Sequence, residues 1–274
     1  MIRFGGIWMS IYSLEHTKYL KKLKREKRII TIFRFLIIVL FIVTWEVLSR
    51  FNLINTFLSS SPSRVLATIR SLINDGSLFK HISITLYEVF ISFGIATVIG
   101  LLLATILWSK PIISKIVDPY LTILNSLPKV ALGPLIIIWV GASINSIIFM
   151  SLLISTFITI INIYNGFNAT DKSYITLLKS FKATKIQIFT KVILPSNYVN
   201  IINALKINIS MNLIGVIMGE LLVSKNGLGY LIMYGSQVFN IDLVITSVFV
   251  LGIISYLMYF LIDRLEHFVL SKRG

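Results

Sequence analysis

Long apolar runs, separated by short polar or basic stretches, dominate the pattern of this chain. About six of these runs are as long as a helix that crosses the hydrocarbon core of a bilayer. They cover roughly residues 29–48, 86–108, 120–140, 147–164, 198–222 and 241–262. Only helices and closed barrels satisfy their backbone groups inside a membrane. The pattern therefore predicts an all-α polytopic membrane protein with six transmembrane helices.

The third run contains two prolines, Pro128 and Pro134. A proline inside a helix removes a backbone hydrogen bond, so neighbouring helices must satisfy the freed carbonyl group. We therefore expect this span to be kinked inside the bundle.

A shorter helix of a different kind is expected between the first two runs. A Ser-Pro-Ser motif at residues 61–63 is a helix-start signal, and Val65, Leu66 and Ile69 follow it at helical spacing. This spacing predicts an amphipathic helix that lies at the membrane surface.

The polar and basic connection between the fourth and fifth runs covers residues 165–197. Its apolar residues recur at helical spacing on both sides of a break near Ala183 and Thr184, which predicts two short amphipathic helices. The apolar residues before the break include Leu177, Leu178 and Phe181. Such helices either lie on the membrane surface or dock into a groove on a cytoplasmic partner.

The composition agrees with a membrane protein and excludes several other classes. Hydrophobic residues make up 56% of the 274 residues, charged residues make up 14%, and the mean hydropathy is +0.87. Soluble domains carry about 25% charged residues, so an ordinary globular domain and a disordered chain are both excluded. The chain has no cysteine, which excludes disulfides, thiolate metal sites and cysteine catalysis.

The net charge of +15 is distributed unevenly between the two sides that six spans define. Most lysines and arginines fall in the two termini and in the connections on their side. The opposite connections carry few basic residues, namely Arg50, Arg64, Arg70, Lys80 and Lys225. The positive-inside rule therefore places both termini in the cytoplasm. The excess charge is explained by topology and by contact with anionic lipid, and we expect no nucleic acid as partner.

We divide the chain into a basic cytoplasmic tail, residues 1–28, and a single transmembrane domain, residues 29–270. The sequence has no Walker A phosphate loop, no H-E-x-x-H and no G-x-S-x-G motif. Its three histidines, His16, His81 and His267, lie too far apart in sequence to suggest a metal site. The ionisable residues in or beside the spans form no close motif, and they are Arg34, Glu46, Glu88, Lys129, Lys206 and Glu220. We therefore expect no catalytic, cofactor or metal site, and no enzyme.

The connection at residues 165–197 resembles the cytoplasmic E-A-A loop of binding-protein-dependent ABC importer permeases. In that loop, E-A-A is followed three residues later by glycine and, after nine more residues, by Ile-x-Leu-Pro. The Val-x-Leu-Pro at residues 192–195 matches the second half at the correct spacing. The first half departs from it, because Thr-Leu-Leu at residues 176–178 occupies the E-A-A positions and Lys182 occupies the glycine position.

Other segments resemble the nitrate, sulfonate and taurine subgroup of these permeases, which includes permeases for thiamine precursors. They are Trp45–Ile54, Ser61–Thr68, Leu127–Gly141 and Gly215–Ile232. The resemblance covers about residues 35–270. The order and the spacing of these segments make it specific.

The resemblance implies a type I, MetI-like permease fold in the plasma membrane of a bacterium. It also implies a second permease copy that forms a homodimer, ATPase subunits that bind ATP, and an extracytoplasmic substrate-binding protein. The implied substrate is a small organic anion such as an aliphatic sulfonate, taurine or nitrate; a pyrimidine precursor of thiamine is the alternative. The residues implied in coupling to the ATPase are Leu177, Leu178, Phe181, Lys182, Ala183, Thr184, Leu194 and Pro195.

Four residues are candidates for the transport pathway or its gate, and they are Lys129, Gly215, Gly219 and Glu220. Each also has a simpler interpretation. The two glycines form a G-x-x-x-G motif that lets helices approach closely. Glu220, near the outer end of its span, is either solvated or part of a gate. Lys129 either snorkels or faces a cavity that attracts an anion, and Lys206 is expected to snorkel to the interface.

A secondary transporter driven by an ion gradient is a further alternative. Such a protein needs coupling carboxylates near the midplane of the membrane. Glu88 is the only plausible residue for that role in the sequence.

Overall fold

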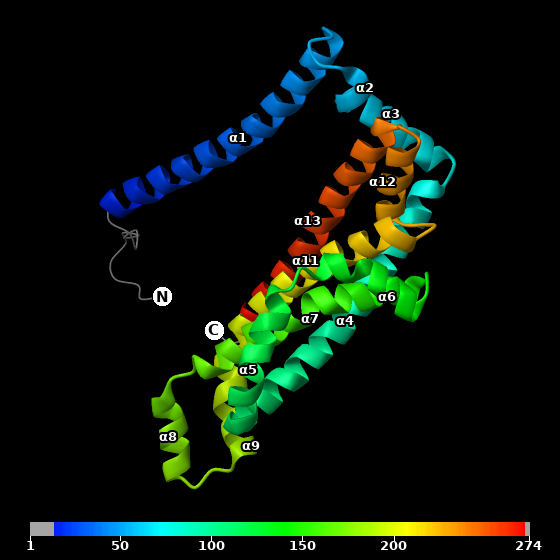
Figure 1. The fold of residues 1–274 in the computed structure, drawn as a ribbon. Helices are drawn as coiled ribbons and strands as arrows, with labels where there is room; N and C mark the ends of the chain where they lie inside the picture. The colour runs from blue at the N-terminus through cyan, green and yellow to red at the C-terminus, as the bar shows by residue number, and fades with distance from the viewer. Residues whose placement is uncertain (1–13, 272–274) are drawn as a thin grey trace. The chain divides into compact units, whose positions relative to one another are not determined.

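The computed structural model describes residues 14–271, and every regular element in that range is helical (Figure 1). The long helices are α1 (Leu14–Arg50), α4 (Ser77–Ser109), α7 (Ile144–Asn168), α11 (Tyr198–Val223) and α13 (Ile241–Ser271). The shorter helices are α2 (Thr56–Ser59), α3 (Pro62–Asn74), α5 (Pro111–Ser126), α6 (Gly133–Val140), α8 (Lys172–Ser180), α9 (Lys185–Ile188), α10 (Leu194–Ser196) and α12 (Leu228–Gln237). The chain divides into two compact units, the first ending at Arg64 and the second beginning at Val65.

The long helices confirm the membrane-spanning pattern that the sequence predicts. Within the described residues, five continuous helices are long and apolar enough to cross a bilayer. The remaining predicted span, the third along the chain, is a pair of helical segments, Pro111–Ser126 and Lys129–Val140, bent by 82°. Six spans result when this broken pair is counted as one. The all-α polytopic fold class is therefore confirmed.

The break in the third span occurs at Pro128, one of the two prolines expected to kink it. A residue before a proline is pushed out of the helical region, and Leu127 has the extended backbone angles φ −63° and ψ 141°. Pro134 does not break a helix, because it lies in the first turn of α6. A backbone N–H group at that position has no partner within the helix, so its absence costs no hydrogen bond. The expected kink is therefore a sharp break that Pro128 produces alone.

In the first unit, α1 continues without a break from the basic segment into the predicted first span. Residues 1–13 of the predicted tail lie outside the described residues. Near the end of α1, Glu46 accepts a hydrogen bond from the Arg50 side chain at 2.7 Å. Its second carboxylate oxygen accepts the Ser63 N–H at 3.0 Å, at the start of α3. Glu46 thus links the end of α1 to Ser63 within the first unit.

The second span begins earlier than its apolar run suggests. Gly76 adopts a left-handed conformation with φ +72°, and α4 starts at the next residue, Ser77. The Asp75 carboxylate accepts the Ser77 N–H at 2.9 Å. Hydrogen bonds from the Ser77 hydroxyl and N–H hold the pKa of Asp75 below its ordinary value. This arrangement satisfies a free N–H group of the first helical turn.

Two glycines bring α11 unusually close to α7 in the second unit. A Cβ atom added at Gly215 would lie 2.5 Å from the Cα of Ser151. One added at Gly219 would lie 2.9 Å from the Cα of Ile147. Both distances are shorter than a van der Waals contact, so only glycine permits this approach. The G-x-x-x-G motif is therefore a packing surface in this fold.

A buried polar layer lies within the same contact. Ser151 donates a hydrogen bond to the Asn212 side chain at 2.7 Å, and Asn208 donates to Thr97 at 2.9 Å. These bonds link α7, α11 and α4 at membrane depth. Because hydrocarbon offers polar groups no partners, such pairs fix the register of the helices.

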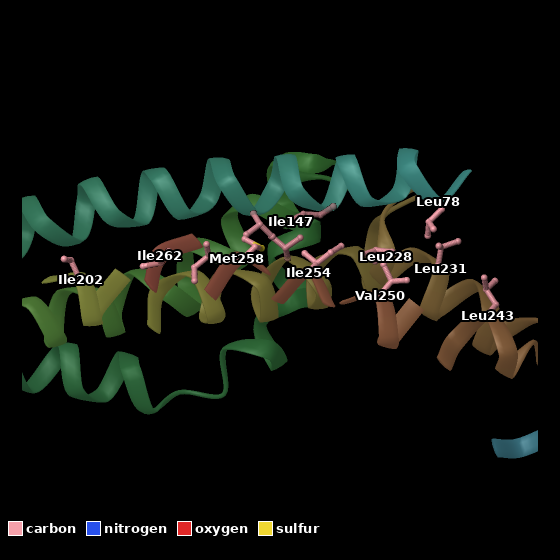
Figure 2. Close-up of a cluster of buried hydrophobic side chains, with 13 residues drawn as sticks. Leu78, Ile147, Ile202, Leu228, Leu231, Leu243, Val250, Ile254, Met258 and Ile262 are labelled. Carbon is pink, nitrogen blue, oxygen red and sulfur yellow. The ribbon is translucent and has the colours of Figure 1, made fainter. Parts of the chain in front are cut away.

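The apolar core of the second unit runs along α4, α11, α12 and α13. Figure 2 shows its side chains in a row beside α4. The labelled members include Leu78, Ile147, Leu228, Val250 and Met258, all of them buried. This row positions α12 and α13 against the α4–α7–α11 group.

The close approach of α7 and α11 predicts that Gly215→Ala destabilises the protein. Its methyl group meets the Ser151 backbone, and such overpacking costs about 1–3 kcal/mol. Gly94→Ala is the matched control, because a Cβ atom there meets nothing within 4 Å. Thermal unfolding of the purified protein in detergent measures both. Equal midpoints for the two variants would contradict this account of the α7–α11 contact.

Candidate functional site

The connection from α7 to α11 folds as two short helices, as predicted, with a turn at residues 181–184. Asp171 begins α8, where its carboxylate accepts the Ser173 N–H at 2.8 Å. Hydrogen bonds from the Ser173 backbone and side chain hold the pKa of Asp171 below its ordinary value. Thr184 begins α9, and its side chain and that of Gln187 cap each other's backbone N–H groups. Local side-chain capping therefore defines both helix starts.

Lys182 occupies the glycine position of the resemblance and adopts the geometry that glycine favours, with φ +55°. Its N–H donates to the Lys179 carbonyl oxygen at 2.9 Å, and the Ala183 N–H donates to that of Leu178 at 3.0 Å. These two bonds define a Schellman motif at the end of α8. A left-handed lysine costs about 1–2 kcal/mol, which these hydrogen bonds and the surrounding packing offset.

The apolar face of this segment divides into two sets of residues. Leu178 and Ala183 pack inward against a cluster that contains Ile188 and Ile193. Leu177 and Phe181 point outward, with exposed fractions of 54% and 75%. The prediction that Leu177, Leu178 and Phe181 share one exposed apolar face is therefore wrong for Leu178. This residue packs into the protein's own core.

Ile186 and Tyr174 extend the exposed set. We call Tyr174, Leu177, Phe181 and Ile186 the exposed tip. Large apolar side chains that protrude together between two spans are typical of a protein-binding surface. The tip is the strongest candidate for partner contact in the part of the chain that the structure describes.

The base of the segment is tied firmly to the spans. Leu194 and Pro195 begin the single turn α10, which leads to the buried Asn197. The Asn197 side chain donates to the Thr170 hydroxyl at 2.7 Å and to the Ile193 carbonyl oxygen at 2.8 Å. The end of α7 and the start of α11 are thereby linked through one amide group.

Lys129 lies directly after the break of the third span. Its Nζ donates to the carbonyl oxygen of Asn125 at 3.0 Å and to the amide oxygen of the same residue at 3.2 Å. The ammonium also lies 5.8 Å from the centre of the Phe157 ring. In an unbroken helix, the Asn125 carbonyl would accept the backbone N–H of residue 129. The side chain of Lys129 thus replaces the hydrogen bond that the break removes.

Lys206 has partners that the sequence did not suggest. Its Nζ lies 2.7 Å from Asp263 and 2.5 Å from Glu266 on α13, and 5.3 Å from the centre of the Tyr259 ring. The Lys206 side chain is only 13% exposed. Two carboxylates therefore hold Lys206 in an ionic contact between α11 and α13.

The remaining candidates for the pathway or gate occupy separate environments. Gly215 and Gly219 face α7, as described above. Glu220 is 1% exposed and accepts hydrogen bonds from Thr85 of α4 and Gly229 of α12. The interpretation of Glu220 as a solvated residue is excluded. Glu88, also 1% exposed, lies beside it, although these two residues form no motif in the sequence.

None of the candidates forms a metal centre. No group of three or more metal-ligating side chains lies together among the residues that the structure describes. His16 and His267 have side chains outside the described residues. His81 accepts the Gly227 N–H through its Nδ1 at 2.9 Å, so it is part of a structural contact.

This architecture and these motifs agree with comparisons to known proteins. The family model for the binding-protein-dependent transport system inner membrane component matches residues 96–273. The chain therefore belongs to this family, and it is the permease of an ABC importer. The expectation that it is a transport component and not an enzyme is confirmed. An ion-coupled secondary transporter is excluded by the same match.

Curated relatives cover most of the chain. The formylaminopyrimidine transport permease protein ThiX of Halalkalibacterium halodurans is 28% identical over 87% of this chain and 94% of its own length. An aliphatic sulfonates transport permease protein, SsuC of Bacillus subtilis, is 26% identical over 85% of this chain and 84% of its own. The taurine transport system permease protein TauC of Escherichia coli is 23% identical over 79% and 81%.

A solved structure supports the expected fold. A chain of the inward-facing MetNI methionine ABC transporter superimposes with a TM-score of 0.61 at 22% sequence identity. The match covers 68% of this chain and 92% of that chain. The MetI-like permease fold is thereby confirmed.

Proposed function

We propose that the exposed tip of the α8–α9 segment couples this permease to its ATPase subunits. The single observation that carries this proposal is the exposure of four large apolar side chains on a segment whose base is tied to α7 and α11. An apolar tip docks into a groove on a partner, and a tied base transmits the movement of that partner to the spans. ATP binds to the ATPase subunits, and this chain needs no cofactor of its own.

The other partners follow from the same role. A second copy of this permease completes the translocation path as a homodimer. A substrate-binding protein delivers its ligand at the outer face, and the basic segment of α1 contacts anionic lipid. Membership of a binding-protein-dependent family supports the binding protein and the ATPase.

The α8–α9 segment then lies in the cytoplasm, and so do both termini. The distribution of basic residues supports this orientation, because lysine recurs through residues 172–191. α3 lies on the outer side.

The substrate that we propose is a small organic anion such as an aliphatic sulfonate, taurine or nitrate. SsuC and TauC, two relatives of this chain, carry names of this substrate class. Lys129 adds a fixed positive charge at the break of the third span, where it favours an anion. A pyrimidine precursor of thiamine is the second candidate, favoured by the relative ThiX, which is 28% identical.

The ligand of the cognate substrate-binding protein decides between these candidates. We expect the purified binding protein to bind a sulfonate, taurine or nitrate in titration calorimetry. Binding of a formylaminopyrimidine with no response to anions would replace the first candidate by the second. Neither outcome depends on which residues contact the ATPase.

The coupling role predicts that Phe181→Asp separates the permease from its ATPase. Burial of a large apolar side chain in a partner groove contributes about 1.5–3 kcal/mol, so its loss weakens the complex about 10-fold or more. Co-purification of the ATPase and substrate uptake by cells both measure the effect. Phe239→Asp is the control, because Phe239 is similarly exposed, at 72%, and lies just after α12, outside the α8–α9 segment.

A comparison with Leu178→Asp distinguishes loss of the ATPase contact from loss of stability of the permease itself. Leu178 packs inward, so its replacement by a charge is expected to lower the thermal stability of the permease. Phe181→Asp should leave that stability unchanged. Wild-type ATPase co-purification and uptake in a correctly inserted Phe181→Asp protein would refute the coupling role.

The orientation predicts which introduced cysteines react in intact cells. The chain has no native cysteine, so Ser71→Cys and Thr184→Cys each carry a single thiol, and both positions are exposed. An impermeant thiol reagent is expected to label Ser71→Cys only, whereas both should react after the cells are opened. Labelling of Thr184→Cys from outside would invert the topology.

A further inference from the structure

A buried hydrogen-bond network anchors the start of α12, away from the α8–α9 segment (Figure 1). Glu220 on α11 accepts the Thr85 hydroxyl at 2.7 Å and the Gly229 N–H at 2.5 Å. Thr85 in turn accepts the Leu228 N–H at 2.9 Å, and His81 accepts the Gly227 N–H at the same distance. Side chains of α4 and α11 thus accept hydrogen bonds from three successive N–H groups, those of residues 227–229. At the start of a helix such groups have no partner within the helix itself.

The loop before α12 is built around the Glu220 carboxylate. Gly227 has φ +104°, and a Cβ atom there would lie 2.3 Å from the carboxyl group of Glu220. A Cβ atom at Gly229 would lie 2.7 Å from the Glu220 side chain. A larger side chain at either position would push the Glu220 side chain out of its place. A carboxylate at the N-terminus of a helix is also favoured by the helix dipole.

Glu88 brings a second carboxyl group into this network. It lies within hydrogen-bonding distance of the Glu220 carboxyl group, and both residues are 1% exposed. The Oε2 atom of Glu88 is buried without a partner in the described part of the chain. Two ionised carboxylates only accept hydrogen bonds, so a bond between them requires that one carries a proton. Two negative charges buried side by side repel each other strongly.

Glu220 is the member of the pair whose hydrogen bonds favour the ionised form. It already accepts from Thr85 and Gly229, and donors of this kind stabilise a carboxylate. Glu88 has only Glu220 as a hydrogen-bond partner among the described residues. The proton therefore belongs on Glu88, from which it is donated to Glu220.

We propose that Glu88 and Glu220 form a proton-binding site, in which one shared proton holds Glu220 in place as the cap of α12. The site binds a proton from water and releases it to water, and no other reactant takes part. Loss of the proton leaves two charges facing each other, which pushes Glu220 away from Thr85 and Gly229. The loop and the start of α12 are then released from α4.

The other groups around the pair do not replace this proton. His81 on α4 stacks on Tyr230 of α12, with ring centres 5.9 Å apart. The charges of Asp75 and Lys80 interact electrostatically with His81. From α7, Ile147 packs against Gly219 next to Glu220, and α13 contributes Leu243 to the adjoining apolar cluster. His81 is therefore the ionisable neighbour whose own titration must be separated from that of the pair.

The proton itself is measurable by infrared spectroscopy of the purified permease. A protonated carboxylic acid has a C=O stretching band that carboxylates and amides lack. We expect this band at neutral pH, its loss on titration to alkaline pH, and its absence in Glu88→Gln. A wild-type protein without the band, or a band that persists in both Glu88→Gln and Glu220→Gln, would overturn the proposal. The wild-type titration decides the question even if a variant fails to fold.

A second measurement separates a proton site from a purely structural contact. The thermal unfolding midpoint of the wild type is expected to fall as the pH rises and the proton is lost, by about 2–4 °C or more. Glu88→Gln keeps a neutral donor beside Glu220, so its midpoint should stay level over the same range. His81→Gln should retain the wild-type decline, and so should Glu46→Gln, which lies outside the network. An identical decline in Glu88→Gln and the wild type would refute the site.

Discussion

The close contact between α7 and α11 is the constraint on which the second unit depends. Gly215 and Gly219 leave no side chain between the two backbones, so the helices cannot separate or slide without breaking the bond between Ser151 and Asn212. Packed interfaces of this kind move as bodies and do not deform continuously. Because α8 to α10 join the end of α7 to the start of α11, a force on that connection acts on both helices together.

Polar groups inside the spans fix geometry more than they add stability. Hydrogen bonds between membrane helices contribute about 0.6 kcal/mol on average, because the unfolded chain in the membrane also finds partners. Their effect is on register: Asn208 reaches Thr97 in one position of α4 only, and Lys206 reaches both carboxylates of α13 in one position only. The bundle therefore has a defined alignment along its length, which its apolar core alone would not specify.

Much of this fold could be predicted from the sequence, because hydropathy and proline act locally. The span positions, the break at Pro128 and the two helices around Thr184 all depend on neighbouring residues. The polar network could not be predicted, since Thr85 and Glu220 are 135 residues apart, and Lys206 and Asp263 are 57 apart. The start of α4 was missed for a related reason: its first turns carry polar residues, and two of these, His81 and Thr85, are buried against the loop before α12.

The shape of the exposed tip depends on the backbone of the turn at Lys182, whereas its chemistry depends on other side chains. Backbone hydrogen bonds set the turn, and a lysine in place of the glycine of related loops leaves it intact. Phe181 and Ile186 contribute to neither of the two bonds that define the Schellman motif. Their identity is therefore free to change in evolution while the direction of the protrusion stays constant. Under the proposed coupling role, paralogous permeases in one cell can diverge in their choice of ATPase through single substitutions at the tip.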